Sequence, residues 1–194
     1  MLTDYYGNHL TTSTGLARDS YDIGVRAFLS ANYGAQEAFS QAVEADPNFA
    51  LAYLGLARAF MSSGQVAEAK AALGKAKNLL EGVTDREKSH FLCCELLLLG
   101  EAKKARTAVD SHALEWPRDA MVAQMNTSVF GLIGFSGEMG RETDLLDYTT
   151  KLMPHYGEDW WMMSMHAISL CETGQTLKSM QLMEKALNLN PRNA

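Results

Sequence analysis

The chain has 194 residues, of which 47% are hydrophobic, so it is long and apolar enough to bury a continuous core. Its formal net charge of −6 argues against nucleic acid or an anionic membrane surface as the main partner, because both favour clustered Lys and Arg. No apolar run is long enough to span a membrane, and the N-terminus lacks the basic start and apolar stretch of a secretory signal, so we expect a cytoplasmic location.

Residues 1–13 precede the first helical pattern and contain the run Asp4-Tyr5-Tyr6-Gly7-Asn8. Helical arrays need terminal segments that cover their ends, so we predict that residues 1–13 cap the first helical unit. A catalytic loop is the alternative, because irregular segments often carry functional side chains.

Two segments of the chain share the order small, large, small at the same internal spacing. The residues are Ala35, Phe39 and Ala42 in the first segment and Ala69, Leu73 and Ala76 in the second. The offset between them matches the period of about 34 residues that is typical of tetratricopeptide-type helical hairpins stacked into a solenoid. In such hairpins the small residues let helices approach closely, and the large residue fills the space between three helices.

Turn residues divide the rest of the chain at a similar period. In chain order they are Pro47, Gly64, Gly100, Pro117, Gly134, Gly174 and Pro191. The stretch 118–153 is predicted to be a degenerate unit, because residues 136–140 add extra turn residues. The fold class expected is therefore all-α, a right-handed α-solenoid of about five hairpins in a single domain over residues 1–194. We expect no sheet, because no stretch alternates apolar and polar residues.

Local helix-start signals accompany the repeat. Thr84-x-x-Glu87 is a capping box that predicts the start of a helix. The pairs Asp46-Pro47 and Asn190-Pro191 place a capping side chain before a proline, and they predict helix starts of the same kind.

Cysteines and histidines give little sign of chemistry. Cys93, Cys94 and Cys171 are interpreted as buried apolar residues, and the five histidines lack metal-ligand spacing, so neither a metal nor a cofactor is expected. His90 and Cys94 lie one helical turn apart and could serve as base and nucleophile. The sequence supplies no orienting third group for this pair.

Several motifs together resemble one family across essentially the whole chain. They are Asp4-Tyr5-Tyr6-Gly7-Asn8-x-Leu10-Thr11-Thr12-Ser13, Tyr21-Asp22, Ala45-Asp46-Pro47-x-Phe49-Ala50, Thr84-x-Arg86-Glu87-x-x-His90, Trp116-Pro117-Arg118-Asp119-Ala120 and Leu187-x-Leu189-x-Pro191-Arg192. In order and spacing they are similar to the tetratricopeptide-repeat protein 38 family. The resemblance implies an all-helical cytosolic repeat protein with no established activity.

Similar proteins of that family continue with further helices, beginning with a histidine-rich segment that this chain lacks. We therefore expect the chain to be the N-terminal part of a longer solenoid, cut at a repeat boundary.

The concave groove of such a solenoid is lined by first-helix positions that packing leaves free. Candidate groove residues are Arg58, Met61, His90, Cys94, Gln124, Ser128, Trp161 and Ser164. Polar members could hydrogen-bond an extended peptide, and Met61 and Trp161 could give apolar contact. Arg58 is the single basic residue of the predicted lining, which disfavours the clamp for a C-terminal carboxylate found in chaperone-binding repeats. The run Trp160–Met163 is predicted to be half core, with a surface anchor as the alternative.

Three classes of function remain open. The favoured class is a non-catalytic scaffold that binds a protein or extended peptide in the groove, with no nucleic acid and no membrane as partner. The second is the N-terminal half of a regulatory or enzymatic composite, whose small-molecule or catalytic site is completed by an absent C-terminal region. The third is a self-contained enzyme that uses His90 and Cys94.

The last predicted helix, from Gln175 to about Asn188, carries apolar residues on two sides. A helix of this kind needs cover on both sides, so we expect self-association that buries Leu182 and Leu189.

Overall fold

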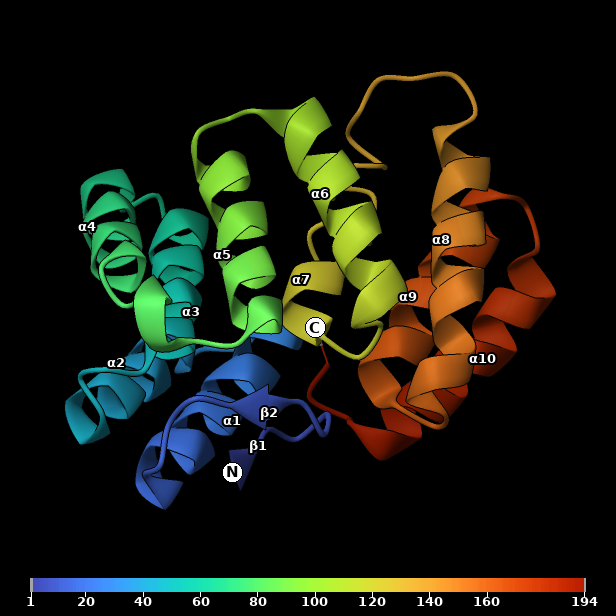
Figure 1. Cartoon of the computed structure of the whole chain (residues 1–194). Helices are drawn as coiled ribbons and strands as arrows, with labels where there is room; N and C mark the ends of the chain where they lie inside the picture. The colour runs from blue at the N-terminus through green and yellow to red at the C-terminus, as the bar shows by residue number, and fades with distance from the viewer. Residues whose placement is uncertain (1, 194) are drawn as a thin grey trace.

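The computed structural model describes residues 2–193, and within them the chain forms ten α-helices, one 3-10 turn and one pair of very short strands (Figure 1). The elements are β1 (Leu2–Thr3), β2 (His9–Leu10), α1 (Gly15–Leu29), α2 (Ala35–Ala45), α3 (Ala50–Ser62), α4 (Val66–Lys77), the 3-10 turn η1 (Leu80–Gly82), α5 (Asp85–Leu98), α6 (Ala102–Glu115), α7 (Ala120–Ala123), α8 (Arg141–Tyr156), α9 (Trp160–Glu172) and α10 (Thr176–Leu189).

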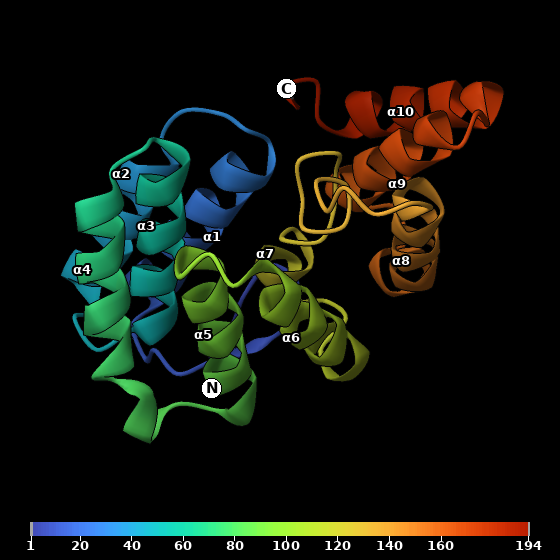
Figure 2. The ribbon, with the colours of Figure 1, turned by 90° about the horizontal axis from the view of Figure 1, so that it is seen from above.

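Consecutive helices pack as hairpins that follow one another in chain order. The pairs α1/α2, α3/α4, α5/α6 and α9/α10 are each in close contact, and α8 packs on α9. Figure 2 shows α1 to α4 on one side, α5 to α7 in the middle and α8 to α10 on the other side of an arc. The predicted all-α solenoid of helical hairpins is confirmed. No helix in residues 2–193 is both long and apolar enough to cross a membrane.

Phe39 lies at the centre of the first repeats and is fully buried. A Cβ placed on Gly24 would lie 2.7 Å from the Phe39 ring, and one on Gly55 would lie 2.5 Å from it. The rings of Tyr21 and Phe49 pack nearby. The repeat residues share this core, since all of them are buried: Ala35, Phe39, Ala42, Ala69, Leu73 and Ala76. Small residues on α1 and α3 thus admit one large ring from α2, as the repeat pattern requires.

Helix starts agree with the sequence in one place and differ in two. The capping box at the start of α5 is confirmed, because the Thr84 side chain and the Glu87 backbone and side chain pair reciprocally. Asp46 instead follows the last residue of α2, and its carboxylate accepts a hydrogen bond from Asn48 N, while α3 begins only at Ala50. Asn190 likewise follows the end of α10. Both X-Pro pairs mark turns after a helix, as expected where proline restricts the residue before it.

The fourth predicted unit departs from a regular hairpin. α7 ends after four residues, and the backbone between residues 124 and 140 forms turns. Leu132 N donates to Met125 O at 2.8 Å, and Ser128 adopts a positive φ of 66°. Of this unit, the second helix, α8, is the one that forms at full length.

The expectation of no sheet is wrong in one detail. β1 and β2 pair antiparallel, with Leu2 opposite Leu10 and Thr3 opposite His9. The turn between them is closed by Asp4, whose carboxylate accepts from Asn8 N at 2.8 Å. A two-residue pair is too short for alternation to be visible in the sequence.

Candidate functional site

A pocket of about 410 Å³ lies where α3, α5 and α6 face the irregular segment 124–138. Its lining consists of Arg58, Leu97, Ala102, Lys103, Arg106, Gln124, Met125, Ser128, Phe130, Gly131, Leu132, Phe135, Ser136 and Glu138. Three of the eight candidate groove residues, Arg58, Gln124 and Ser128, therefore meet in one place. We call this the central pocket.

Arg58 lines the central pocket as a buried side chain and is not a surface residue. The residue is 6% exposed, although the sequence placed it on a solvent-facing position. Its Nη1 donates to Met121 O at 3.0 Å, its Nη2 donates to the Gln124 side-chain oxygen, and its guanidinium lies 5.0 Å from the centre of the Phe28 ring. Met121 lies within α7, and Gln124 is the residue that follows its last turn.

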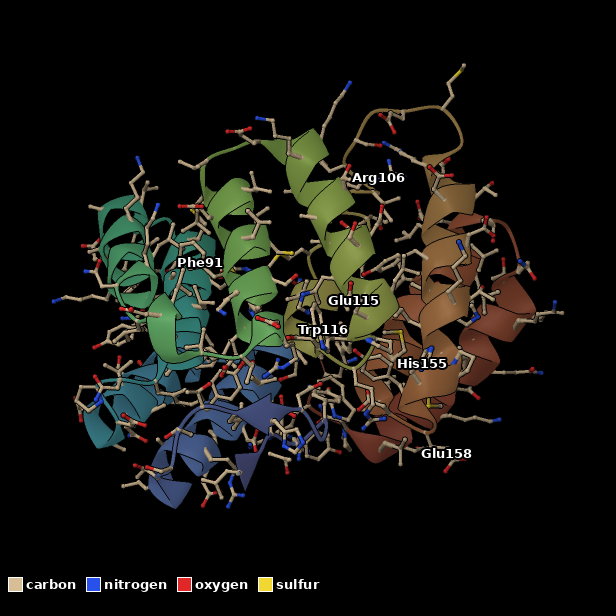
Figure 3. The ribbon with its side chains drawn as sticks, viewed as in Figure 1. Phe91, Arg106, Glu115, Trp116, His155 and Glu158 are labelled. Atoms are coloured by element: carbon tan, nitrogen blue, oxygen red, sulfur yellow. The ribbon has the colours of Figure 1, made fainter. Side chains whose placement is uncertain are left out.

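Irregular backbone builds the opposite wall of the central pocket. Phe130 and Phe135 are 84% and 77% exposed. Arg106, labelled in Figure 3, is on α6 and donates to Glu138 and to Asp144 on α8, each at 2.8 Å. These ion pairs hold the far end of the segment against α6 and α8.

A second pocket, of about 520 Å³, adjoins the first at Gln124. It is formed by the turn between α1 and α2 together with the C-terminal half of α3. Asn32 in that turn donates to Arg192 O at 2.6 Å, so the turn between α1 and α2 meets the chain after α10 beside this pocket. The candidate Met61 is 38% exposed on α3. The two pockets share Gln124 as a lining residue, and we refer to the two together as the groove.

A separate buried cluster of charged residues surrounds Asp119. Its carboxylate pairs with Arg86, lies 3.1 Å from His90 Nδ1 and lies 3.3 Å from His112 Nε2. All four side chains are at most 6% exposed. Burial by itself raises the pKa of Asp119, but His90 and Arg86 outweigh it and hold that pKa well below its usual range.

The N-terminal segment lies against this cluster. Arg86 Nη2 donates to His9 O at 2.9 Å, and Thr11 N donates to Glu87 Oε1 at 3.0 Å. Tyr5 N also donates to Asp22 on α1 at 3.0 Å. The part of residues 1–13 that the structure describes thus contacts α1 and the start of α5, well beyond the first hairpin alone.

The pair His90 and Cys94 does gain an orienting group, Asp119, that the sequence did not reveal. The burial of the His90–Cys94 pair argues against catalysis by these two residues. His90 is 1% and Cys94 0% exposed, so no substrate can reach them in this structure. Burial lowers the pKa of His90, yet the Asp119 carboxylate outweighs this and raises the pKa to about 9. An imidazole that is protonated at neutral pH cannot act as a general base.

The two candidates on α9 lie apart from the groove. Trp161 is 1% exposed and packs against the Tyr156 ring, and Ser164 is 1% exposed and accepts a hydrogen bond from Asn193. All four residues of the run Trp160–Met163 are buried, so the surface-anchor alternative is wrong. Among the cysteines, Cys93 and Cys94 are buried as interpreted, whereas Cys171 is exposed.

Several residues of the groove and the cluster escaped the sequence analysis. Lys103, Phe130 and Phe135 line the central pocket, and Arg86 and Asp119 form the cluster. Arg86 and Asp119 belong to motifs that carry the family resemblance, which was the one signal available for them. Residues 2–193 contain no group of three or more His, Cys, Asp or Glu side chains arranged to hold a metal ion.

Comparison with known proteins addresses the first repeats most directly. Residues 34–87 match the tetratricopeptide repeat family model. This tetratricopeptide repeat segment begins just before α2 and ends in the first turn of α5, so it contains the Phe39 core. The fold of the chain is an all-α tetratricopeptide-type solenoid.

The chain is also similar to several solved structures. The crystal structure of YrrB, described as a TPR protein with an unusual peptide-binding site, is 17% identical, has a TM-score of 0.44, and the match covers 89% of this chain and 83% of that one. Two crystal structures of MamA are 19% and 20% identical, with TM-scores of 0.41 and 0.42, covering 89% and 86% of this chain and 91% and 94% of theirs. No curated protein matches the chain in sequence.

Proposed function

We propose that the chain is a non-catalytic scaffold that binds a protein or extended peptide in the groove. The observation that carries the proposal is that two pockets share Gln124 as a lining residue, with the exposed rings of Phe130 and Phe135 in one lining and hydrogen-bonding side chains in both. Grooves that combine apolar contact with fixed polar groups suit extended peptides, whose backbone and side chains need both. The cytoplasmic location and the resemblance to the tetratricopeptide-repeat protein 38 family are part of this proposal.

An array of immobilised peptides tests this function. The whole chain should be retained by a subset of the peptides, and replacing Phe130 and Phe135 together by Ser should weaken retention at least about tenfold, because both rings lose their apolar contact. Leu177→Ser is the matched control, since Leu177 is 78% exposed on α10 and lies outside the groove. Equal retention of the double variant and the original chain would contradict groove binding.

We propose in addition that the chain self-associates through the α9–α10 face. A cleft of about 350 Å³ on this face is lined mainly by apolar side chains: Ile168, Cys171, Ser179, Met180, Met183, Glu184 and Leu187. Met180 is 56% and Leu189 50% exposed. Apolar side chains that lie together on one face favour contact with another protein surface. A second copy of the chain presents the same apolar face, so the two faces can pack against each other.

A further inference from the structure

Arg58 is a buried cation that has no acidic partner among the residues that the structure describes. The ion pairs of residues 2–193 involve other basic side chains, and the groups that act on Arg58 are the thiols of Cys94 and Cys93 and the phenol of Tyr21. Burial consequently lowers the pKa of the guanidinium. Since a buried charge costs free energy unless it is paired, this arginine differs from Arg86, which has Asp119 as its partner.

Neutral groups satisfy Arg58 only in part. A guanidinium has five N–H donors, and in the described residues those of Arg58 meet Met121 O and the Gln124 amide oxygen, with the Cys94 thiol as a further hydrogen-bonding neighbour. The Phe28 ring adds a cation–π contact at 5.0 Å. These contacts fix the direction of the side chain toward the central pocket and leave its positive charge uncompensated.

The other charged side chains of the central pocket leave its positive charge in excess. Lys103 lies on the rim, and it is exposed and free of any ion pair in residues 2–193. The acidic side chain in the lining, Glu138, is already paired with Arg106, which also pairs with Asp144. The apolar wall next to these charges consists of Leu97, Leu132, Phe130 and Phe135.

We propose that the central pocket selects peptides with an internal Asp or Glu, whose carboxylate pairs with Arg58, next to a large apolar residue that packs on Phe135 and Leu132. The proposal rests on the groove-binding function above and names its preferred ligand. A carboxylate matches the fork of the guanidinium, and pairing inside a pocket of low dielectric is stronger than pairing at the surface. The uncompensated charge favours an acidic ligand over a neutral one of the same shape.

Paired peptides on the array test the preference. Each short peptide, acetylated and amidated at its ends, has a central Glu-Phe or Asp-Leu step, and its twin has Gln-Phe or Asn-Leu. The chain should bind the acidic member at least about tenfold more tightly, as expected for a charge-assisted hydrogen bond. A third member carries the neutral step and a free C-terminal carboxylate, and it should bind no better than the neutral twin.

Variants of the chain assign the preference to Arg58. Arg58→Met should abolish the difference between twins, and Arg58→Lys should keep part of it because the charge remains without the fork. Lys103→Glu changes an exposed residue, keeps the fold, and should reduce the difference several-fold. Arg141→Met is the control, because Arg141 is 41% exposed, pairs with Glu142 and lies outside the pocket, so this variant should keep the full difference.

The outcomes separate this proposal from the groove function. Equal binding of acidic and neutral twins by the original chain, or stronger binding of the free carboxylate member, overturns the selection of an internal acid while leaving groove binding intact. Absence of binding to every peptide overturns both. Arg58→Met could lower the melting temperature too far for binding measurements. In that case, the difference in affinity between acidic and neutral peptides, measured with the original chain and with Lys103→Glu, still tests the proposal.

Discussion

The contact between Phe39 and the two glycines of α1 and α3 gives the sharpest prediction for a single residue. Gly55→Ala would place a Cβ 2.5 Å from the Phe39 ring, and the buried ring has no free space into which to move. We expect a loss of about 1–3 kcal/mol in the free energy of unfolding, measured by urea denaturation.

Gly74→Ala is the matched control for this substitution. Gly74 also lies within a helix, α4, but a Cβ there meets no heavy atom within 4 Å. Its replacement should leave stability unchanged or raise it by up to about 1 kcal/mol, because glycine is a poor helix former. Equal losses in the two variants would show that contact with Phe39 is not the cause of the loss at Gly55.

His90 predicts how stability depends on pH. Its pKa is raised from 6.5 to about 9 by Asp119, so folding favours the protonated form. The stabilisation is fully present below pH 6.5 and is lost as pH rises through about 9. Between these values the melting temperature should fall, and His90→Gln should flatten the fall. The same slope in the variant would exclude His90 as its origin.

Acid conditions should act on the same cluster through Asp119. Because the pKa of this carboxyl is held well below 3.8, its stabilisation is present above that value and is lost as pH falls toward its folded pKa. Asp119→Asn should therefore be less stable than the original chain at neutral pH and should approach it as the pH is lowered, as thermal unfolding over this range would reveal. The structural reason is that Asn cannot compensate the charges of Arg86 and His90.

Among the elements, the β1–β2 hairpin depends on contacts far away in the sequence. Arg118 Nε donates to Tyr6 O at 2.6 Å, Arg118 O accepts from Asn8 at 3.1 Å, and its Nη1 donates to His155 O. Arg118 thus joins the N-terminal hairpin to the end of α8, in the region of Trp116 and His155 labelled in Figure 3.

Arg118→Met should loosen this junction without unfolding the helices. Loss of the two side-chain hydrogen bonds, to Tyr6 O and His155 O, is expected to cost about 0.5–1.5 kcal/mol because the side chain is exposed. The bond from Asn8 to the Arg118 backbone oxygen remains. Amide hydrogen exchange should rise several-fold in residues 2–12 and stay unchanged in α3 and α4. Arg18→Met, which removes an arginine of α1 that pairs with Asp19 in the part of the chain that the structure describes, should leave the exchange of the hairpin unaltered.

Features of the fold that depend on residues close together in the sequence were predictable from the sequence. Features that depend on contacts between distant segments were not. The spacing around Phe39 and Leu73 reports helix packing directly, and the capping box at Thr84 acts within one turn. The break after α7 depends instead on the bond from Leu132 to Met125 and on the backbone of Ser128, which no periodicity records. Arg58, which the sequence placed on a solvent-facing position, is buried and lines the pocket beside this break.

For the molecule as a whole, the arc leaves its two end hairpins in different environments. Near the first hairpin, Asn32 meets Arg192, so the turn between α1 and α2 is joined to the chain after α10. The α9–α10 face has no such neighbour among residues 2–193, and its cleft remains open beside Met180 and Leu187. The sequence had identified this helix through Leu182 and Leu189, of which Leu182 is half-buried and Leu189 exposed.

Self-association through this face should depend on concentration and on the apolar cleft. We expect the original chain to form dimers whose fraction rises with concentration in sedimentation equilibrium. Met180→Lys with Leu187→Glu should shift the chain to monomer, because charges placed in the contact must lose their hydration when it forms. Leu114→Glu is the control, since Leu114 is 83% exposed on α6 and is not part of the α9–α10 cleft, so this variant should dimerise as before. An original chain that stays monomeric at millimolar concentration would refute the proposal, and equal dimerisation of the double variant would place the contact elsewhere.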